Sequence, residues 1–254
     1  MCQFKSGVIL KNRVVLAPIY NESHSDLLRK LNIEDTTENA MTKFVRAELV
    51  PPKGDKTAEL KKWKYIVDQD VVPDWYSEDP YRYENEFRAS VEQWVKETIT
   101  IICGKPCVTL KKDDKGTYYM LWDILFESKF GKDNNYATSY VRENLQTCDF
   151  VKELKESYGD RLVPITTDLF SMDGFDDYGK VEGDILALRT FDLNRECRRN
   201  IPNANKWEWL ATPNSTPSGC SSDDVQYVDS IGCVDYCWYC GSVAVRPFFI
   251  LKAV

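Results

Sequence analysis

Alternating apolar and polar positions predict several short strands in the first hundred residues. Residues 7–18 contain two apolar runs around a Lys-Asn-Arg turn, a pattern typical of a β-hairpin. Residues 44–50 have apolar side chains at every second position, and residues 63–67 form another short run, so both are predicted to be strands. Between residues 79 and 98 the apolar side chains recur at helical spacing. These elements predict a small α+β domain over residues 1–102.

A second hairpin and a long helical region begin the rest of the chain. Residues 108–113 and 117–126 are β-runs around an Asp-Asp-Lys-Gly turn. Apolar side chains repeat at helical spacing over residues 139–158, with a break expected near residues 147–149. We predict that residues 103–254 form one domain with mainly antiparallel sheet and one or two helices. The fold class predicted for the whole chain is therefore α+β.

Shorter runs predict the remaining elements of the second domain. They are a strand or connector at 162–169 that Pro164 interrupts, a strand at 185–188, a short basic helix at 193–199, a buried strand at 207–210, and a hairpin at 226–235 that turns at Ser230-Ile231-Gly232. The loop at 173–179 is acidic and flanked by glycine, but it lacks the glutamate spacing of an EF-hand. We interpret it as an ordinary turn cluster.

Charge and hydropathy argue against two kinds of partner. The 254 residues carry a formal net charge of −7, and binding to nucleic-acid phosphates requires a basic surface. No apolar run approaches the roughly 20 residues that a membrane-spanning helix needs. The first 18 residues also lack the apolar core and small-residue cleavage site of a signal peptide. We therefore expect no nucleic acid, no membrane span and no signal peptide.

The sequence contains few of the residues on which common enzyme mechanisms depend. His24 is the only histidine, which disfavours histidine-based acid–base and Ser–His chemistry. The glycine-rich phosphate loops, zinc-protease motif and nucleophile-elbow motif are all missing. We predict no catalytic residues, no cofactor and no metal.

The nine cysteines leave one alternative open. Their odd number and irregular spacing are not those of a disulfide framework, so we expect free thiols. Cys103 and Cys107 have a spacing that resembles half of a zinc site, and Cys237 and Cys240 would supply the other half. A cysteine-dependent or zinc-containing enzyme is therefore the alternative to a non-catalytic protein.

The run from Cys220 to Val245 has an unusual composition. It contains no Lys, Arg, Glu, Met or Leu, and it carries four Asp. Valines typical of a buried sheet interleave with residues that an asparagine codon reaches by changes at its adenines alone. Gln and Trp, which such changes never produce, appear once each, as Gln226 and Trp238. Adenine-directed mutagenesis of a template repeat leaves this pattern.

We predict that the interleaved residues form a diversified ligand-binding surface on a fixed framework. Tyr, Ser, Gly and Asp are the side chains that adaptable recognition surfaces use, because tyrosine provides rigid contact area at low entropic cost. The framework is expected to include Val225, Val228, Val234 and Trp238. The predicted binding residues are Ser222, Asp223, Asp224, Tyr227, Asp229, Ile231, Cys233, Asp235, Tyr236, Cys237, Tyr239, Cys240 and Ser242.

Four short sequences after residue 136 carry a resemblance to a known family. They are Tyr140-Val141-Arg142-Glu143-Asn144-Leu145, Trp209-Leu210-Ala211-Thr212-Pro213, Ser230-Ile231-Gly232 and Val245-Arg246-Pro247-Phe248-Phe249. Together they resemble a C-type-lectin-like module related to the formylglycine-generating-enzyme fold, as found in gut bacteria and their phages. Some relatives with this fold are variable proteins of diversity-generating retroelements, in which variable residues end the chain and display a ligand-binding surface. The calcium-ligand tripeptides of carbohydrate-binding lectins are missing.

The resemblance implies a non-catalytic binding protein. A C-type-lectin-like domain would display the diversified surface to a protein or cell-surface ligand. A small phage-associated domain would precede it in the sequence. We expect such a protein in the bacterial cytoplasm or in a phage virion, and its oligomeric state stays open. Two alternatives remain beside this reading. They are a cysteine-dependent or zinc-containing enzyme related to formylglycine-generating enzymes, and a structural component of a virion or its assembly.

Overall fold

The structure is a computed structural model that describes most of the second half of the chain and selected parts of the first. The residues it describes are 2–10, 13–17, 28–29, 32–34, 43–50, 64–69, 86, 89–90, 93, 97–202, 204, 206–230 and 232–252. The chain divides into two compact units, Met1–Thr100 and Ile101–Val254. Together the described elements make an α+β fold, as the sequence predicts.

The first unit contains a four-stranded antiparallel sheet in the order β2-β1-β3-β4. Its strands are β1 (Cys2–Leu10), β2 (Arg13–Ala17), β3 (Lys43–Val50) and β4 (Lys64–Gln69). The predicted hairpin and the two predicted strands of this region are confirmed. Most of the helix predicted at 79–98 lies outside the described residues, although residues 86, 89–90, 93 and 97–98 are helical.

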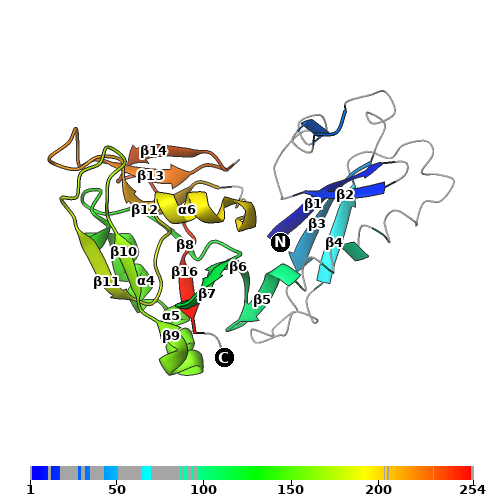
Figure 1. The fold of residues 1–254 in the computed structure, drawn as a ribbon, viewed down its shortest axis with the longest axis horizontal. Helices are drawn as coiled ribbons and strands as arrows, with labels where there is room; N and C mark the ends of the chain where they lie inside the picture. Colours follow the sequence, from blue (N-terminus) through cyan, green and yellow to red (C-terminus); the bar gives the residue numbers. More distant parts are fainter. Residues whose placement is uncertain are drawn as a thin grey trace. The chain divides into compact units, whose positions relative to one another are not determined.

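The second unit is built mainly from two five-stranded sheets (Figure 1). One has the order β5-β6-β7-β16-β9, with β5 (Ile99–Ile102), β6 (Lys105–Asp113), β7 (Gly116–Leu121), β16 (Phe248–Leu251) and β9 (Leu162–Val163). The other has the order β14-β13-β12-β15-β8, with β14 (Val234–Trp238), β13 (Asp224–Val228), β12 (Glu208–Pro213), β15 (Val243–Val245) and β8 (Phe126–Ser128). A separate antiparallel pair joins β10 (Ile165–Asp168) to β11 (Lys180–Asp184).

Most strand pairs in this unit are antiparallel, as the sequence predicts. The exception among the described pairs is β12 with β15, which run parallel. Arg246 and Pro247 connect β15 directly to β16. The last strands of the chain therefore pass from one sheet into the other, where β16 lies between β7 and β9.

The described part of this unit contains three α-helices, whereas the sequence predicted one or two. They are α4 (Tyr140–Thr147), α5 (Asp149–Tyr158) and α6 (Phe191–Cys197). The expected break near 147–149 is confirmed, because extended backbone at Cys148 separates α4 from α5. The hydroxyl of Ser139 caps α4 and that of Thr190 caps α6, each accepting a hydrogen bond from a first-turn amide. The short 3₁₀ helices are η3 (Tyr136–Thr138), η4 (Gly159–Arg161) and η5 (Arg198–Asn200).

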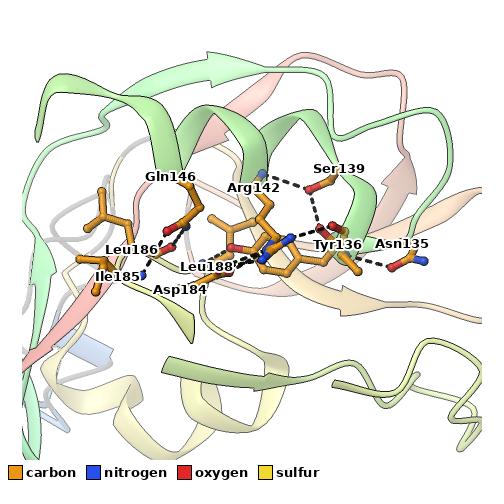
Figure 2. Close-up of polar contacts among 10 residues, drawn as sticks. Asn135, Tyr136, Ser139, Arg142, Gln146, Asp184, Ile185, Leu186 and Leu188 are labelled. Carbon is orange, nitrogen blue, oxygen red and sulfur yellow. Dashed lines mark hydrogen bonds and ion pairs between the residues drawn. The ribbon is translucent and has the colours of Figure 1, made fainter. Parts of the chain in front are cut away.

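The strand predicted at 185–188 is wrong, and side chains of the helical region show why. Gln146 accepts a hydrogen bond from the amide of Ile185 at 3.1 Å and donates one to the carbonyl of Leu186 at 2.6 Å. The amide of Leu188 donates to the hydroxyl of Tyr136 at 3.2 Å (Figure 2). Together with an isolated antiparallel bridge between Ala187 and Phe248 of β16, these side chains satisfy the backbone of the segment. The segment is therefore ordered and largely buried without forming a ladder. The strand lies just before it, as β11.

An ion pair fixes the start of the same segment to α4. Arg142 donates to both carboxylate oxygens of Asp184, at 2.9 and 3.1 Å from Nε and 2.9 Å from Nη2 (Figure 2). Asp184 is almost fully buried, and this bidentate arrangement is the strongest geometry available to a carboxylate. Arg142 and Gln146 lie one helical turn apart and therefore share one face of α4. The hydrogen bonds from this face position residues 184–186.

Aromatic and aliphatic side chains fill the core between the helices and the sheets. Trp209 of β12 contacts Phe130 edge-to-face, with ring centroids 5.4 Å apart. Phe249 of β16 contacts Phe150 of α5 in the same way at 5.9 Å. Three of these four rings are essentially inaccessible, and Phe150 is 3 % exposed. Two of the sequences that carry the family resemblance therefore supply central core residues.

Among the described residues, no helix is both long enough and apolar enough to cross a membrane.

Candidate ligand-binding surface

The predicted binding residues cluster on a hairpin at the edge of the second sheet. β13 and β14 pair antiparallel, with Gln226 opposite Tyr236 and Val228 opposite Val234. This confirms the predicted hairpin. β14 is the outermost strand of its sheet, next to β13 (Figure 1). An edge strand is a common place for recognition because one of its sides has no neighbouring strand.

The two strands of the hairpin differ in burial. Residues 225–228 of β13, which lies between β12 and β14, are all buried, so both faces of this strand are covered. On β14, Tyr236 is 53 % exposed and Trp238 is 69 % exposed. These two residues are two positions apart and so share one face of the strand. The outer strand therefore presents two large aromatic rings to solvent.

Tyr227 does not belong to the exposed surface, contrary to the prediction. Its side chain is 6 % exposed and stacks on Trp207, with ring centroids 4.6 Å apart. Burial raises the pKa of its hydroxyl, and the nearby carboxylate of Asp235 raises it further. The register explains the difference: Tyr227 lies two residues from Val225, so both point to the face that packs on the core.

Val234 differs from the prediction of a buried residue, and Trp238, which was predicted only to belong to the fixed framework, is exposed. Trp238 is the most exposed large apolar side chain of the described residues, and Val234 is only partly buried. The reason is again position, because both residues belong to the edge strand rather than to β13. The framework positions Val225 and Val228 are buried as predicted.

The remaining predicted residues range from exposed to half-buried. The exposed ones are Asp223, Cys233, Asp235, Tyr236, Cys240 and Ser242, and the half-buried ones are Ser222, Asp224, Asp229, Cys237 and Tyr239. Ile231 lies outside the described residues. Together with Trp238, the six exposed residues are named the display surface below.

Asn134 fixes one border of the display surface through hydrogen bonds to main-chain carbonyl groups. The side-chain amide of Asn134 is completely buried and donates to the carbonyl oxygens of Ser215 at 2.8 Å and Asp224 at 2.9 Å. Its backbone amide donates to the carbonyl of Ser222 at 3.0 Å. The hydroxyl of Tyr178 donates to its side-chain oxygen at 2.6 Å. The segment at 222–224 is thus positioned through its backbone, whatever side chains it carries.

Main-chain bonds also fix the turn that follows β14. The amide of Tyr239 donates to the carbonyl of Asp223 at 2.9 Å, and the amide of Phe130 donates to the carbonyl of Tyr239 at 2.8 Å. The amide of Gly241 closes the turn on the carbonyl of Trp238 at 3.1 Å. These bonds run through the backbone, so they do not depend on which side chains the turn carries.

The acidic loop at 173–179 braces the segment before the display surface. The hydroxyl of Ser171 donates to Asp173 at 2.6 Å, and the hydroxyl of Ser215 donates to the other carboxylate oxygen. Asp177 accepts from the amide of Ser218 at 2.7 Å. These hydrogen bonds lower the pKa values of both carboxyl groups, because they stabilise the ionised forms. Sequence reasoning treated this loop as a turn cluster and missed its bracing role.

The hairpin of β13 and β14 and the residues beside it carry a net negative charge. Asp223, Asp224, Asp229 and Asp235 all lie in or beside the hairpin, and the run from Cys220 to Val245 contains no Lys or Arg. Burial raises the pKa of Asp224, and the adjacent carboxylate of Asp223 adds to this effect. Such an arrangement favours a ligand with positive charge at its rim.

The four cysteines of the zinc alternative do not form a metal site in the described structure. Cys107 is fully buried in β6, whereas Cys240 is exposed in the turn after β14. No three His, Cys, Asp or Glu side chains gather at a metal-binding distance anywhere in the described residues. Burial raises the pKa of the Cys237 thiol to about 11, and Asp224 and Asp235 contribute to the rise. This thiol is therefore poorly suited to act as a thiolate nucleophile.

No family model, curated protein or solved structure matches this chain.

Proposed function

We propose that the protein is a non-catalytic ligand-binding protein whose display surface contacts a protein or cell-surface ligand. The observation that carries the proposal is the exposure of Tyr236 and Trp238 on an edge strand whose flanking segments are held through their backbone. Tyrosine and tryptophan are the residues that most often dominate the energy of protein interfaces. Soluble proteins seldom leave two such rings exposed side by side without a partner.

The separation of framework from exposed side chains supports diversification of this surface. Asn134, Phe130 and Ser215 bond to carbonyl or amide groups at residues 220–224 and 239, and these groups are common to all amino acids. A surface anchored in this way tolerates substitution at most exposed positions. This matches the codon pattern expected from adenine-directed mutagenesis by a retroelement.

A C-type-lectin-like scaffold is the fold that we propose for the second unit. The sequences that resemble this family supply structural residues: Arg142 binds the buried Asp184, Arg246 binds Glu208, and Trp209 and Phe249 fill the core. A virion or the bacterial cytoplasm is the setting that we propose, and several copies would add avidity if the protein assembles.

A whole-cell binding experiment tests the proposed function. The fluorescently labelled chain is measured by flow cytometry against a panel of bacterial cells, beside the double variant Tyr236→Ala, Trp238→Ala. A matched control is Tyr140→Ala, since Tyr140 is 37 % exposed but lies on α4. We expect the double variant to lose at least tenfold in affinity and the control to bind normally. Equal binding by all three proteins would contradict the proposal.

A genomic observation tests the diversification separately. A reverse-transcriptase gene beside a near-copy of codons 220–246, differing at adenines, is the expected finding. Related copies should then vary at Asp223, Asp235 and Tyr236 while retaining Val225 and Val228. Equal variation at the buried valines would contradict diversification, although binding through the display surface would still stand.

A further inference from the structure

A cavity of about 820 Å³ opens in the second unit, apart from every residue of the display surface. Residues of β10, α6 and β16 line it, together with the segments beside them. Its walls include the rings of Tyr118, Phe191 and Phe248 and the aliphatic side chains of Ile165, Leu188 and Ile250. A cavity of this size and composition falls within the range of small-molecule binding sites in proteins.

The walls of this cavity are held in place before any ligand arrives. Leu188 is tied to the Tyr136 hydroxyl through its amide, in the network that joins α4 to residues 184–188 (Figure 2). The hydroxyl of Thr212 accepts a hydrogen bond from the amide of Phe191 at 2.8 Å, which fixes the start of α6 against β12. A preformed cavity binds more tightly than one that must be ordered on binding.

A buried polar side chain of the cavity wall has no protein partner. Thr167 of β10 is 3 % exposed, and its hydroxyl makes no hydrogen bond. The neighbouring hydroxyls of Thr190 and Thr212 are both occupied, as acceptors for the amides of Leu193 and Phe191. A buried hydroxyl without a partner destabilises a folded protein, so a partner supplied by a ligand restores that free energy.

The rim of the cavity combines apolar side chains with charged ones and carries no unbalanced negative charge. Phe170 and Met172 line the cavity and are 52 % and 43 % exposed, so their side chains offer contact area at the mouth. The two carboxylates at the cavity are each paired with a cation, Asp168 with Lys180 and Asp192 with Arg195. Lys115 also lines the cavity, but its side chain is exposed and its charge stays in contact with water. The enclosed, mainly apolar walls therefore favour an uncharged occupant.

We propose that this cavity binds a neutral small molecule with an aromatic or aliphatic body and one hydrogen-bonding group that meets the Thr167 hydroxyl. The rings of the walls contact the body of the molecule, and Phe170 and Met172 cover its outer end. This site is separate from the display surface and does not depend on the function proposed for it.

A dye titration on the full chain tests this site. The probe is Prodan, a neutral naphthalene with a single ketone oxygen, whose emission shifts to the blue in an apolar environment. We expect saturable binding with a blue shift. Thr167→Val should weaken binding about three- to tenfold, because one neutral hydrogen bond is lost. The same variant should unfold at an equal or higher denaturant concentration than the wild type, since it removes an unpartnered buried hydroxyl.

Matched variants separate the cavity from other places where a dye binds. Thr216→Val removes a hydroxyl that is also fully buried but lies outside the cavity, and it should leave the affinity within twofold of the wild type. Phe170→Ala at the rim should weaken binding, whereas Trp238→Ala on the display surface should not. The anionic dye anilinonaphthalene sulfonate should bind more weakly than Prodan.

Three outcomes would overturn the proposal. The first is an absence of saturable Prodan binding. The second is binding that Trp238→Ala abolishes and Thr167→Val leaves unchanged, which would place the dye on the display surface. The third is tighter binding of the anionic dye through the same residues, which would exclude a preference for neutral ligands.

Discussion

The Nε atom of Arg246 lies 2.8 Å from Oε2 of Glu208, and both side chains are about 2 % exposed. The same carboxylate oxygen accepts a hydrogen bond from Arg189 at 2.9 Å. Arg246 further donates to the carbonyls of Trp122 at 3.2 Å and Pro202 at 2.7 Å. A single buried carboxylate thus bridges two buried guanidinium groups between β12 and the end of β15, and the triad keeps one net positive charge.

We predict that Glu208→Gln destabilises the protein by about 3–5 kcal/mol, because it leaves two buried cations without a counter-charge. Urea unfolding measures the change. The matched control is Glu196→Gln, which removes the exposed pair of Glu196 with Lys111 and should cost no more than about 1 kcal/mol. A loss of similar size in both variants would show that the buried triad contributes no more than a surface pair.

Truncation of two tyrosines in the same hairpin should have opposite consequences. Tyr227→Ala is expected to cost about 3 kcal/mol in the free energy of unfolding, because a buried ring that stacks on Trp207 is lost. Tyr236→Ala should change it by no more than about 0.5 kcal/mol, since its ring is mostly exposed. Denaturant titration of both variants provides the measurement. A large loss from Tyr236→Ala would argue that its ring packs on the sheet.

The bracing of Ser215 by Asp173 should weaken in acid. The folded state lowers the pKa of Asp173, chiefly through the hydrogen bond from Ser171 and then that from Ser215. A carboxyl group with a lowered pKa stabilises the fold above its unfolded pKa of about 3.9. That contribution is lost as the pH falls through the lower folded value.

The backbone amide of Cys220 donates a hydrogen bond to the Ser215 hydroxyl at 2.7 Å. The NMR resonance of this amide therefore reports on the position of Ser215. We expect this resonance to shift between pH 5 and pH 2 in the wild type and to be displaced already at neutral pH in Asp173→Asn. Asp176→Asn, in the same loop, is the control. An unchanged Cys220 resonance in Asp173→Asn would exclude the bracing role.

The cysteines of the hairpin should differ in reactivity toward alkylating reagents. The pKa of Cys237 is raised to about 11, mainly by burial, whereas Cys233 and Cys240 are exposed. At pH 7.5 iodoacetamide should modify Cys233 and Cys240 well before Cys237, because the thiolate is the reactive form. The rate at Cys237 should keep rising up to about pH 11. Mass spectrometry of the digested protein identifies the order, and early modification of Cys237 would contradict its burial.

Local sequence patterns were sufficient for much of the fold. The hairpin around residues 113–116, the helical region that breaks at Cys148 and the hairpin that ends in β14 all follow from turn residues and periodicity. Each of these features depends on residues close together in the chain. Their prediction therefore needs no knowledge of tertiary contacts.

Other features depend on contacts between residues far apart in the chain. Residues 185–188 read as a strand from their apolar character. Their backbone bonds instead go to the side chains of Gln146 and Tyr136 and, at Ala187 alone, to the backbone of Phe248, which are about 40 to 60 residues away. The bracing of Ser215 by Asp173 spans a similar separation. No local signal marks such partners, and the acidic loop therefore read as an ordinary turn.

The sequence by itself determined the α+β class, the hairpin that carries the candidate surface, and the alternation of side chains along its strands. Only the tertiary structure decided which of those side chains face solvent. Tyr227 and Trp238 illustrate the reason: alternation assigns each residue to a face, but packing against neighbouring strands determines which faces are covered. β13 lies inside the sheet and is buried, and β14 lies at its edge and is open. The cavity beside Thr167 likewise arises only where β10, α6 and β16 meet.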